Sequence, residues 1–420
     1  MQLRQYQTDI STAACELLKK HNIAYLNMQV RTGKTITAFE TVKKYVAKIV
    51  IFVTKKKAMS SVEKDYLDNY ANDFKCYLIN FESLHKLAGI QADLFIIDEA
   101  HSLGQFPVAS LRTQQLKKLC HKLPIIYLSG TPSPESYSQL FHQFWISSYS
   151  PFIETNFYKW AKEYVTISEK YIFNRKINDY SNANRNIIED MTKHLFISYT
   201  QEEAGFTELV QETLHYVKMT DKVYKIANRL RIDKVVTGKD GQVIEADTEV
   251  KLLNKLHQLY SGTVLFDSGT EISDGMILDD TKVKWVLEKF KGRKIAIYYK
   301  FRAEAVMIET ICRMSGLSVT NSAEDFNASD INQIYASQFV SGREGVNLSS
   351  ADALICINID FSAITYFQVR ARLQSKDRTR TAEVHWVFAE GGIEDRIYKA
   401  VSNKKNYTLS YFKKDEKKMD

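Results

Sequence analysis

The first 147 residues alternate short apolar runs with segments of helical periodicity. Three runs are almost continuously apolar: Lys48 to Val53 (KIVIFV), Asp93 to Asp98 (DLFIID) and Pro124 to Gly130 (PIIYLSG). Strands that are apolar on both faces are typical of parallel sheets that helices cover on both sides. Residues 1–147 are therefore predicted to form an α/β domain.

From residue 148 to residue 280 the pattern changes, because aromatic and charged residues mix and helical spacing dominates. Val250 to Gly262 (VKLLNKLHQLYSG) places four leucines on one face and ends at a glycine, as helices often do. The glycines at Gly238 and Gly241 predict a loop tip. We interpret residues 148–280 as a helical insertion.

The α/β alternation resumes in residues 281–408. Lys294 to Tyr299 (KIAIYY) predicts a strand, and further strands are predicted within NQIYAS, ADALICINI and EVHWVFA, before a last helix near EDRIYKAVSNKK. The predicted fold class is α/β, with two parallel sheets flanked by helices and a helical insertion between them. Residues 409–420 form a charged tail that we expect to be solvated.

Composition sets broad limits on this picture. A chain of 420 residues with 45% hydrophobic residues can bury large cores, and its net charge of +7 fits a polyanionic partner without demanding one. The five cysteines and nine histidines are scattered, so we expect no disulfide framework and no structural zinc. The N-terminus lacks signal-peptide features and no apolar run approaches membrane-spanning length, so a soluble, cytoplasmic protein is expected.

The segment from Met28 to Thr35 (MQVRTGKT) ends as a nucleotide-binding phosphate loop ends, although Met28 stands in place of the loop's first glycine. In the functional interpretation, Lys34 meets the β and γ phosphates of a nucleotide and the Thr35 hydroxyl completes a magnesium shell. The alternative is a helix cap followed by a solvated lysine. The backbone N–H groups that would cradle phosphate are those of Arg31, Thr32, Gly33 and Lys34.

The strand that ends in IIDEAH, Ile96 to His101, carries two acids where it leaves the sheet. Ionised carboxylates resist burial unless they bind something, and a magnesium ion that bridges nucleotide phosphates would supply the partner. Asp98 would then hold the metal and Glu99 would polarise the attacking water. A helix-capping acid pair is the alternative. The order of a Gly-Lys-Thr and then an Asp-Glu strand end favours a nucleotide hydrolase that uses ATP and Mg²⁺.

Eight short motifs follow one another along the chain: LRQYQ, RTGKT, IFVTKKK, NFESL, IIDEAH, LSGTP, SGREGVNL and QVRARLQSKDR. This ordered set resembles superfamily 2 helicases and translocases, and most of all their SWI/SNF-type branch and compact bacteriophage-encoded DEAH-box members. The resemblance covers almost the whole chain. It implies two RecA-like lobes with a nucleotide cleft between them, and nucleic acid bound across both lobes.

In the first lobe the resemblance assigns a base-reading segment and a coupling segment. Gln7 would hydrogen-bond the adenine edge, and Arg4 or Tyr6 would help to enclose the base. The motif LSGTP would link hydrolysis to domain movement through Ser129, Gly130 and Thr131.

In the second lobe, SGREGVNL resembles the motif that touches both nucleic acid and nucleotide, with Gly345 and Asn347 as its closest matches. QVRARLQSKDR resembles the arginine-finger motif, in which Gln368 aligns with the glutamine and Arg372 with the first arginine. An arginine supplied by a second lobe would stabilise charge on the transferred phosphoryl group and make hydrolysis depend on lobe closure.

The second arginine of this motif departs from the family. Relatives place it three residues after the first, where this chain has Ser375, and Arg378 or Arg370 is left as a substitute. A further likeness lies in HLFISYTQEEAGF and VKMTDKVYKI, which resemble the SWI/SNF-type segment between the lobes.

Nucleic-acid contacts are predicted where basic residues follow strand ends. Lys55, Lys56 and Lys57 follow the strand of KIVIFV, and Lys300 and Arg302 follow that of KIAIYY. Such side chains bind phosphate without reading sequence, and an ordinary solvated lysine is the alternative.

The sequence thus predicts an ATP-dependent nucleic-acid motor. The favoured form is a DNA-dependent ATPase that translocates on, remodels or unwinds duplex or branched DNA, serving replication, recombination or repair with partner proteins of those processes. The alternatives are an RNA helicase and a nucleic-acid-binding scaffold on a degenerate ATPase fold. Oligomeric state is left open by the sequence.

Overall fold

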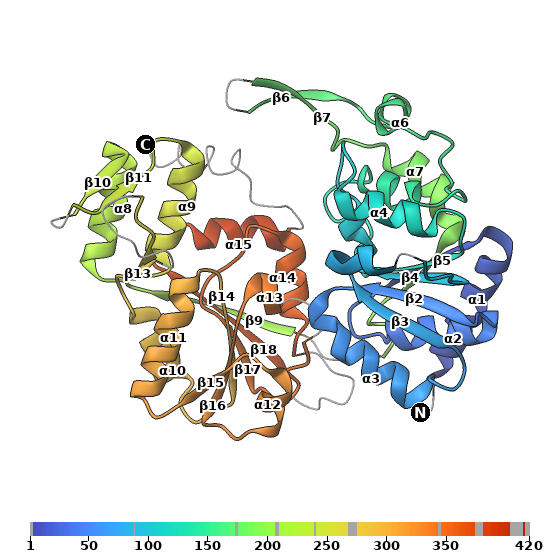
Figure 1. Ribbon diagram of the computed structural model, residues 1–420. Helices are drawn as coiled ribbons and strands as arrows, with labels where there is room; N and C mark the ends of the chain where they lie inside the picture. Colours follow the sequence, from blue (N-terminus) through green and yellow to red (C-terminus); the bar gives the residue numbers. More distant parts are fainter. Residues whose placement is uncertain are drawn as a thin grey trace. The chain divides into compact units, whose positions relative to one another are not determined.

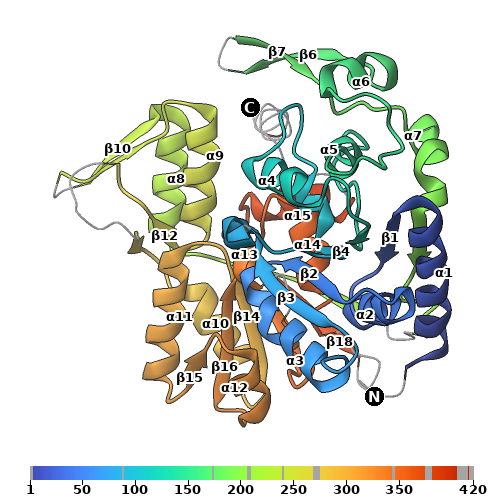
Figure 2. The ribbon, with the colours of Figure 1, turned by 45° about the vertical axis from the view of Figure 1, so that its right-hand side comes forward.

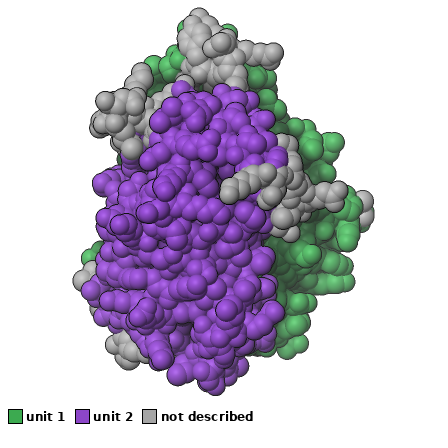
Figure 3. All heavy atoms as spheres, turned by 90° about the vertical axis from the view of Figure 1, so that its left-hand side faces the viewer, with its two compact units in different colours: residues 1–206 green, residues 207–420 purple. Residues whose placement is uncertain are grey.

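The computed structural model of the protein divides into two compact units, residues 1–206 and residues 207–420 (Figures 1 and 3). Each unit is built around its own parallel sheet. The residues that the structure describes are 3–87, 89–172, 175–205, 210–238, 241–267, 275–342, 346–373, 381–403 and 415.

Unit 1 contains a six-stranded sheet in the order β3-β2-β4-β5-β1-β8, in which all neighbouring strands run parallel. Side chains alternate between two apolar faces, so that Tyr25 of β1 joins one core while Leu26 joins the other. The prediction of strands that are buried on both faces is confirmed here. The strands are β1 (Ile23–Met28), β2 (Ile49–Thr54), β3 (Lys75–Asn80), β4 (Leu94–Asp98), β5 (Ile125–Leu128) and β8 (Phe196–Tyr199).

Helices cover both faces of this sheet (Figures 1 and 2). One face packs against α1 (Gln5–His21), α2 (Lys34–Tyr45) and α3 (Met59–Asn69). The other packs against α4 (Leu111–Cys120), α5 (Gln139–Trp145), α6 (Phe157–Tyr164), α7 (Arg185–Thr192) and the 3-10 turns η2 (Phe81–Leu87) and η3 (Ala100–Leu103). The remaining elements are the turns η1 (Lys56–Ala58) and η4 (Lys193–Leu195) and the antiparallel hairpin of β6 (Ser168–Ile172) and β7 (Arg175–Asp179).

Unit 2 contains a second six-stranded parallel sheet, in the order β15-β16-β14-β17-β18-β9. Its strands are β9 (Val210–Val217), β14 (Ile295–Tyr299), β15 (Ser318–Thr320), β16 (Gln333–Gln338), β17 (Ala353–Cys356) and β18 (Ala382–Ala389). Two small antiparallel pairs accompany it: β10 (Val235–Thr237) with β11 (Val243–Glu245), and β12 (Thr263–Val264) with β13 (Met276–Ile277).

The helices of unit 2 again form a layer on each face of the sheet (Figure 1). One layer holds α10 (Thr281–Lys289) and α11 (Arg302–Met314). The core on the other face includes side chains of α8 (Asp221–Asp233), α9 (Glu249–Tyr260), α12 (Ala323–Ala328), α13 (Phe339–Gly342), α14 (Ala363–Arg370) and α15 (Glu394–Ser402). The predicted fold class, α/β with two helix-flanked parallel sheets, is confirmed.

The division between the units falls inside the segment that we interpreted as a helical insertion, residues 148–280. Its first part belongs to unit 1, where β8 pairs with β1, and its second part belongs to unit 2, where β9 pairs with β18. Both are edge strands, and β9 (VQETLHYV) mixes polar with apolar residues, so neither shows the continuous apolar run of a central strand. Among the helices described, none combines the length and apolar character that a membrane crossing requires.

Candidate active site

The loop between β1 and α2 has the backbone shape of an anion-binding turn. Arg31 and Gly33 both adopt left-handed conformations, with φ of 66° and 82°, and α2 begins directly afterwards at Lys34. The hydroxyl of Thr32 donates to the carbonyl of Gln29 at 2.8 Å, which holds the loop tightly wound. A left-handed turn that leads into a helix presents successive backbone N–H groups to an anion.

The ammonium of Lys34 lies across this loop. Its Nζ atom donates to the carbonyl oxygens of Met28 at 2.9 Å and Gln29 at 3.2 Å. A nucleotide phosphate placed over the loop would compete with these two carbonyls for the same cation, since an ammonium donates to whichever oxygens carry most charge. Thr35, the next residue of α2, is half-buried.

The acid pair stands at the carboxyl end of β4. Asp98 accepts hydrogen bonds from the Thr54 hydroxyl at 2.8 Å and from the backbone N–H of Glu99 at 3.0 Å. Burial and the neighbouring Glu99 carboxylate raise the pKa of Asp98 to about 6, while Thr54 and the Lys34 ammonium act in the opposite direction. Any cation that approaches a half-buried carboxylate of this kind stabilises its ionised form. Carboxylate and hydroxyl oxygens of this kind fit a Mg²⁺ ion.

A histidine connects the acid pair to the end of β5. His101 Nδ1 lies 3.0 Å from Ser129 Oγ and 3.2 Å from Glu99 Oε2. Ser129 Oγ in turn accepts from the backbone N–H of Thr131 at 3.1 Å. A Cβ atom on Gly130 would stand 3.1 Å from the carbonyl oxygen of Met28, so this segment packs directly on the phosphate loop. The predicted coupling segment therefore touches both the loop and, through His101, the acids.

The base-reading segment also lies against the phosphate loop. Gln7 is buried and its Oε1 accepts from the backbone N–H of Arg4 at 3.0 Å, which caps the start of α1. The space beside Gly33, where any other residue would carry its Cβ, is filled by the amide Nε2 of Gln7. Tyr6 donates its hydroxyl to the carbonyl of Thr32 at 3.0 Å. The residues predicted to surround the nucleotide in unit 1 thus lie together at the carboxyl ends of the central strands of the sheet.

Three residues at this end of the sheet were not assigned a role from the sequence. His101 could have been identified from its place in the DEAH tetrapeptide, because it follows the acid pair by two positions. Tyr199, whose ring stacks on Tyr6 with centroids 4.5 Å apart, and Gln201 stand in the segment likened to an inter-lobe connection, and neither carries a local signal of its contact with the loop.

In unit 2 the two predicted motifs contact each other. Arg372 is buried and its Nη1 donates to the carbonyl of Val346 at 3.3 Å, next to Asn347. Asn347 accepts from the backbone N–H of Ser349 at 3.1 Å. Gln368 is buried on α14. Gly345 lies outside the described residues.

The alternatives for a second arginine differ in their surroundings. Arg370 Nε lies 2.6 Å from Glu212 Oε1, and the same carboxylate accepts from the hydroxyl of Tyr366 and the indole N–H of Trp386. Ser375 and Arg378 lie outside the described residues. Arg370 is therefore held within its own unit by an anion on β9.

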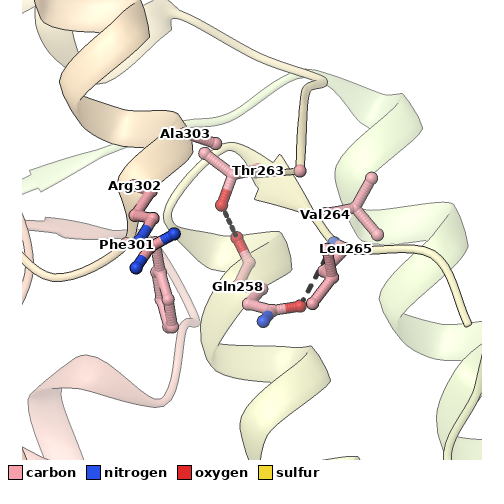
Figure 4. A pocket seen from close by; sticks show the side chains of 8 residues that line it. Gln258, Thr263, Val264, Leu265, Phe301, Arg302 and Ala303 are labelled. Atoms are coloured by element: carbon pink, nitrogen blue, oxygen red, sulfur yellow. Dashed lines mark hydrogen bonds between the residues drawn. The ribbon is translucent and has the colours of Figure 1, made fainter. Parts of the chain in front are cut away.

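The predicted nucleic-acid contacts fall into two groups. Lys55 is half-buried and Lys56 is exposed, at the turn that follows β2. Lys300, after β14, instead forms an ion pair with Asp360, with Nζ and Oδ1 2.6 Å apart. Arg302 is exposed at the start of α11 and lines a pocket of about 190 Å³ together with Gln258, Phe301 and neighbouring residues (Figure 4).

Comparison with known proteins finds a matching family model for the first part of the chain. Residues 1–134 match the family model described as type III restriction enzyme, res subunit. The chain is 23% identical over 178 residues to a SWI/SNF-related matrix-associated actin-dependent regulator of chromatin, subfamily A containing DEAD/H box 1 homolog, of Drosophila melanogaster. It is 34% identical over 76 residues to a putative helicase 172L of Invertebrate iridescent virus 6.

These matches are partial. They cover 38% and 18% of this chain, and only 20% and 12% of the two relatives. Among solved structures, the Sulfolobus solfataricus SWI2/SNF2 ATPase core in complex with dsDNA aligns over 96% of this chain and 91% of that chain, with 18% identity and a TM-score of 0.42. The special likeness to bacteriophage-encoded members stays a prediction. The family and sequence matches confirm the resemblance of this chain to superfamily 2 helicases and translocases of the SWI/SNF-type branch.

Proposed function

We propose that this protein is an ATP-driven motor that acts on nucleic acid, most favourably on duplex DNA. One observation carries the proposal. Three motifs with separate roles lie together at the carboxyl ends of the central strands of the unit 1 sheet. The phosphate loop ends in Lys34, the acid pair begins at Asp98, and the coupling segment packs on the loop at Gly130. Their order along the chain is that of a superfamily 2 ATPase.

The roles follow from the chemistry of each group. The loop N–H groups and Lys34 would bind the phosphates of ATP, and Gln7 with Arg4 would bind the base. Oxygen atoms of Asp98 and Thr35 would hold Mg²⁺. Within the described part of the chain, no group of three or more His, Cys, Asp or Glu side chains is placed to hold a metal ion. When bound, the metal would neutralise charge that develops on the phosphates. Glu99 would orient and deprotonate the attacking water.

The second unit would contribute cations and a nucleic-acid surface. Arg372 is proposed to stabilise the γ-phosphate during hydrolysis, with Gln368, Gly345 and Asn347 as neighbouring contacts. Support comes from the motif in which it stands and from its packing against Val346. Cycles of closing and opening would then move the protein along nucleic acid.

The preference for DNA rests on one relative, which is described as a regulator of chromatin. The net charge of +7 supports a polyanionic partner, and does so equally for DNA and RNA. Lys55 and Lys56 are proposed to contact the phosphate backbone, as is Arg302. Replication, recombination and repair are the processes in which such a motor would serve.

The decisive experiment measures ATP hydrolysis by the parent chain in parallel with duplex DNA, single-stranded DNA, forked DNA and RNA. We expect the largest stimulation with duplex or forked DNA. Stimulation by single-stranded RNA above that by duplex DNA would instead indicate an RNA helicase. A Lys34→Ala variant serves as the control, and a turnover equal to that of the parent would indicate a scaffold on an inactive ATPase fold.

A further inference from the structure

The chain leaves unit 1 beside the phosphate loop. Strand β8 is the last strand of the unit and runs parallel to β1, with Tyr199 opposite Met28. The backbone N–H of Gln29, the first residue after β1, donates to the carbonyl of Tyr199 at 2.9 Å. The loop and the exit segment therefore start from adjacent ends of neighbouring strands.

Gln201 ties the two segments together with two hydrogen bonds. Its side-chain Nε2 donates to the carbonyl of Val30 at 2.9 Å, and its backbone N–H donates to the side-chain Oε1 of Gln29 at 2.8 Å. Gln201 thus bonds to two successive residues of the phosphate loop, one through its side chain and the other through its backbone.

The turn that carries Gln201 is stabilised independently of these bonds. The carboxylate of Glu203 accepts from the backbone N–H of Thr200 at 2.6 Å and from its hydroxyl at 2.8 Å. The Tyr199 hydroxyl donates to the backbone carbonyl of Glu203 at 2.8 Å. Because these bonds hold the turn, the side-chain bond from Gln201 to Val30 serves the loop and not the turn.

Gln29 and Val30, to which Gln201 bonds, lie next to the residues that must move when a nucleotide binds. Lys34 donates to the carbonyls of Met28 and Gln29, and it must turn from them to bind phosphate. A shift of Gln29 changes its bond to the backbone N–H of Gln201. Six residues after Gln201, the chain enters unit 2 at residue 207.

From these contacts we infer that Gln201 is a positioning residue for the phosphate loop, and that it links the state of the loop to the first residues of the connection between the units. The inference rests on the proposed function, because it requires that the loop bind ATP. Gln201 itself touches no reacting atom. Its side chain holds the backbone carbonyl of Val30 and its backbone N–H holds the side chain of Gln29, directly before the loop residues whose N–H groups would bind phosphate.

The test is nucleotide affinity in a Gln201→Glu variant. The new carboxylate keeps the size of the side chain but cannot donate to the Val30 carbonyl when ionised. We expect binding of Mg-ADP and of a non-hydrolysable ATP analogue, measured by calorimetry, to weaken roughly five- to tenfold. Gln201→Met, which has a similar length and no donor, should give the same loss and serves if the extra charge disturbs folding. Glu202→Gln, one residue further on an exposed position, is the matched control and should bind as the parent does.

A second measurement separates positioning from a merely structural role. Hydrogen exchange of residues 199–205 should change when the analogue binds to the parent, and this response should be lost in Gln201→Glu. Parent-like affinity together with a parent-like exchange response in Gln201→Glu and Gln201→Met would overturn the inference while leaving the proposed function intact. Failure of the parent to bind either nucleotide would overturn the proposed function, and the inference with it.

Discussion

Gln7 and Gly33 form one packing unit, in which the amide of Gln7 fills the space that a Cβ on residue 33 would need. Gly33 also has a φ of 82°, where residues with a side chain are strained. The base-reading segment and the phosphate loop consequently depend on each other's shape. A substitution at Gly33 would strain the backbone of the loop and would also displace Gln7, which is predicted to bind the base.

Gly33→Ala should therefore lower nucleotide affinity. We expect a loss of about tenfold in ATP affinity, measured by titration calorimetry, because the amide end of Gln7 must leave its place beside residue 33. Gly316→Ala is the matched control: its φ is 73°, and a Cβ there meets nothing within 4 Å. Gly316→Ala should cost about 1 kcal/mol of stability through strain alone and leave ATP binding unchanged. Equal ATP affinity in the two variants would contradict the packing argument.

Mg²⁺-dependent nucleotide binding should respond to the protonation of Asp98. Burial and Glu99 raise its pKa to about 6, so the proton competes with the metal below that pH. Affinity for Mg-ADP should fall by up to about tenfold per pH unit as the pH drops below about 6. For folding the sign is opposite, since the folded protein holds this proton more tightly: stability from Asp98 is greatest at low pH and is lost as the pH rises from about 4 to about 6.

The Thr54→Val variant tests whether Asp98 is the group responsible for the pH dependence of Mg-ADP binding. Thr54 is fully buried and its hydroxyl donates to Asp98, which favours the ionised form. Valine has the same shape and no donor, so the pH midpoint of Mg-ADP binding should move upward while affinity at pH 8 stays close to that of the parent. Titration of the nucleotide itself is common to both proteins and cancels in the comparison. An unchanged midpoint would assign the pH dependence to another group.

The sequence was sufficient to identify the motifs, but not the residues that contact them in the folded protein. Central strands such as β4 are continuously apolar, so their ends, and the chemistry of Asp98 placed there, could be read directly. Tyr199 and Gln201 were missed because they reach the loop through parallel pairing between β1 and β8, which lie some 170 residues apart in the chain and leave no local periodicity. β9 was missed for a related reason, since an edge strand need not be apolar throughout.

Lys300 differs from Lys56 in its surroundings. Its place after β14 predicts a phosphate contact, and the structure pairs it with Asp360, 60 residues further on, and places its Nζ 4.2 Å from the centre of the Phe361 ring. Lys56, by contrast, is exposed. A lysine that already has an anionic partner gains less from a phosphate than an exposed one does, because the existing pair must first be broken.

The salt dependence of DNA binding distinguishes these two lysines. Lys56→Ala should reduce the slope of log K against log salt concentration for duplex DNA by about 1, as expected for one lost phosphate contact. Lys300→Ala should leave the slope nearly unchanged, and Asp360→Asn, which releases Lys300, should increase it. A loss in Lys300→Ala as large as that in Lys56→Ala would show that Lys300 exchanges Asp360 for phosphate in the complex.

A buried polar network behind Lys300 makes the stability of unit 2 depend on pH. The Glu304 carboxyl is fully buried; it accepts from the backbone N–H groups of Lys300 at 2.9 Å and Phe301 at 2.7 Å, and from the side chain of Asn358 at 3.0 Å. Burial is the largest effect on it and raises its pKa to about 7, against these hydrogen bonds. On the other side of Asn358 stands His257, whose pKa burial lowers well below its ordinary value.

The two groups at the ends of this network act in opposite directions. Because the folded-state pKa of Glu304 is raised, its contribution to stability is complete below about pH 4.5 and is lost as the pH rises to about 7, by an amount on the order of 3 kcal/mol. His257 has a lowered folded-state pKa, so its contribution is complete above about pH 6.5 and is lost as the pH falls. The parent's own stability profile therefore mixes two opposing slopes.

Glu304→Gln separates them, because glutamine keeps a carbonyl oxygen for the backbone donors and does not titrate. The difference in unfolding free energy, parent minus variant, should fall by a few kcal/mol between pH 4.5 and pH 7 and stay level above that, when measured by denaturant titration of the cooperative transition of unit 2. The His257 contribution is present in both proteins and cancels. A difference that is flat across this range would mean that Glu304 is ionised at its buried position throughout, held so by its three donors, and that burial does not control the charge of this network.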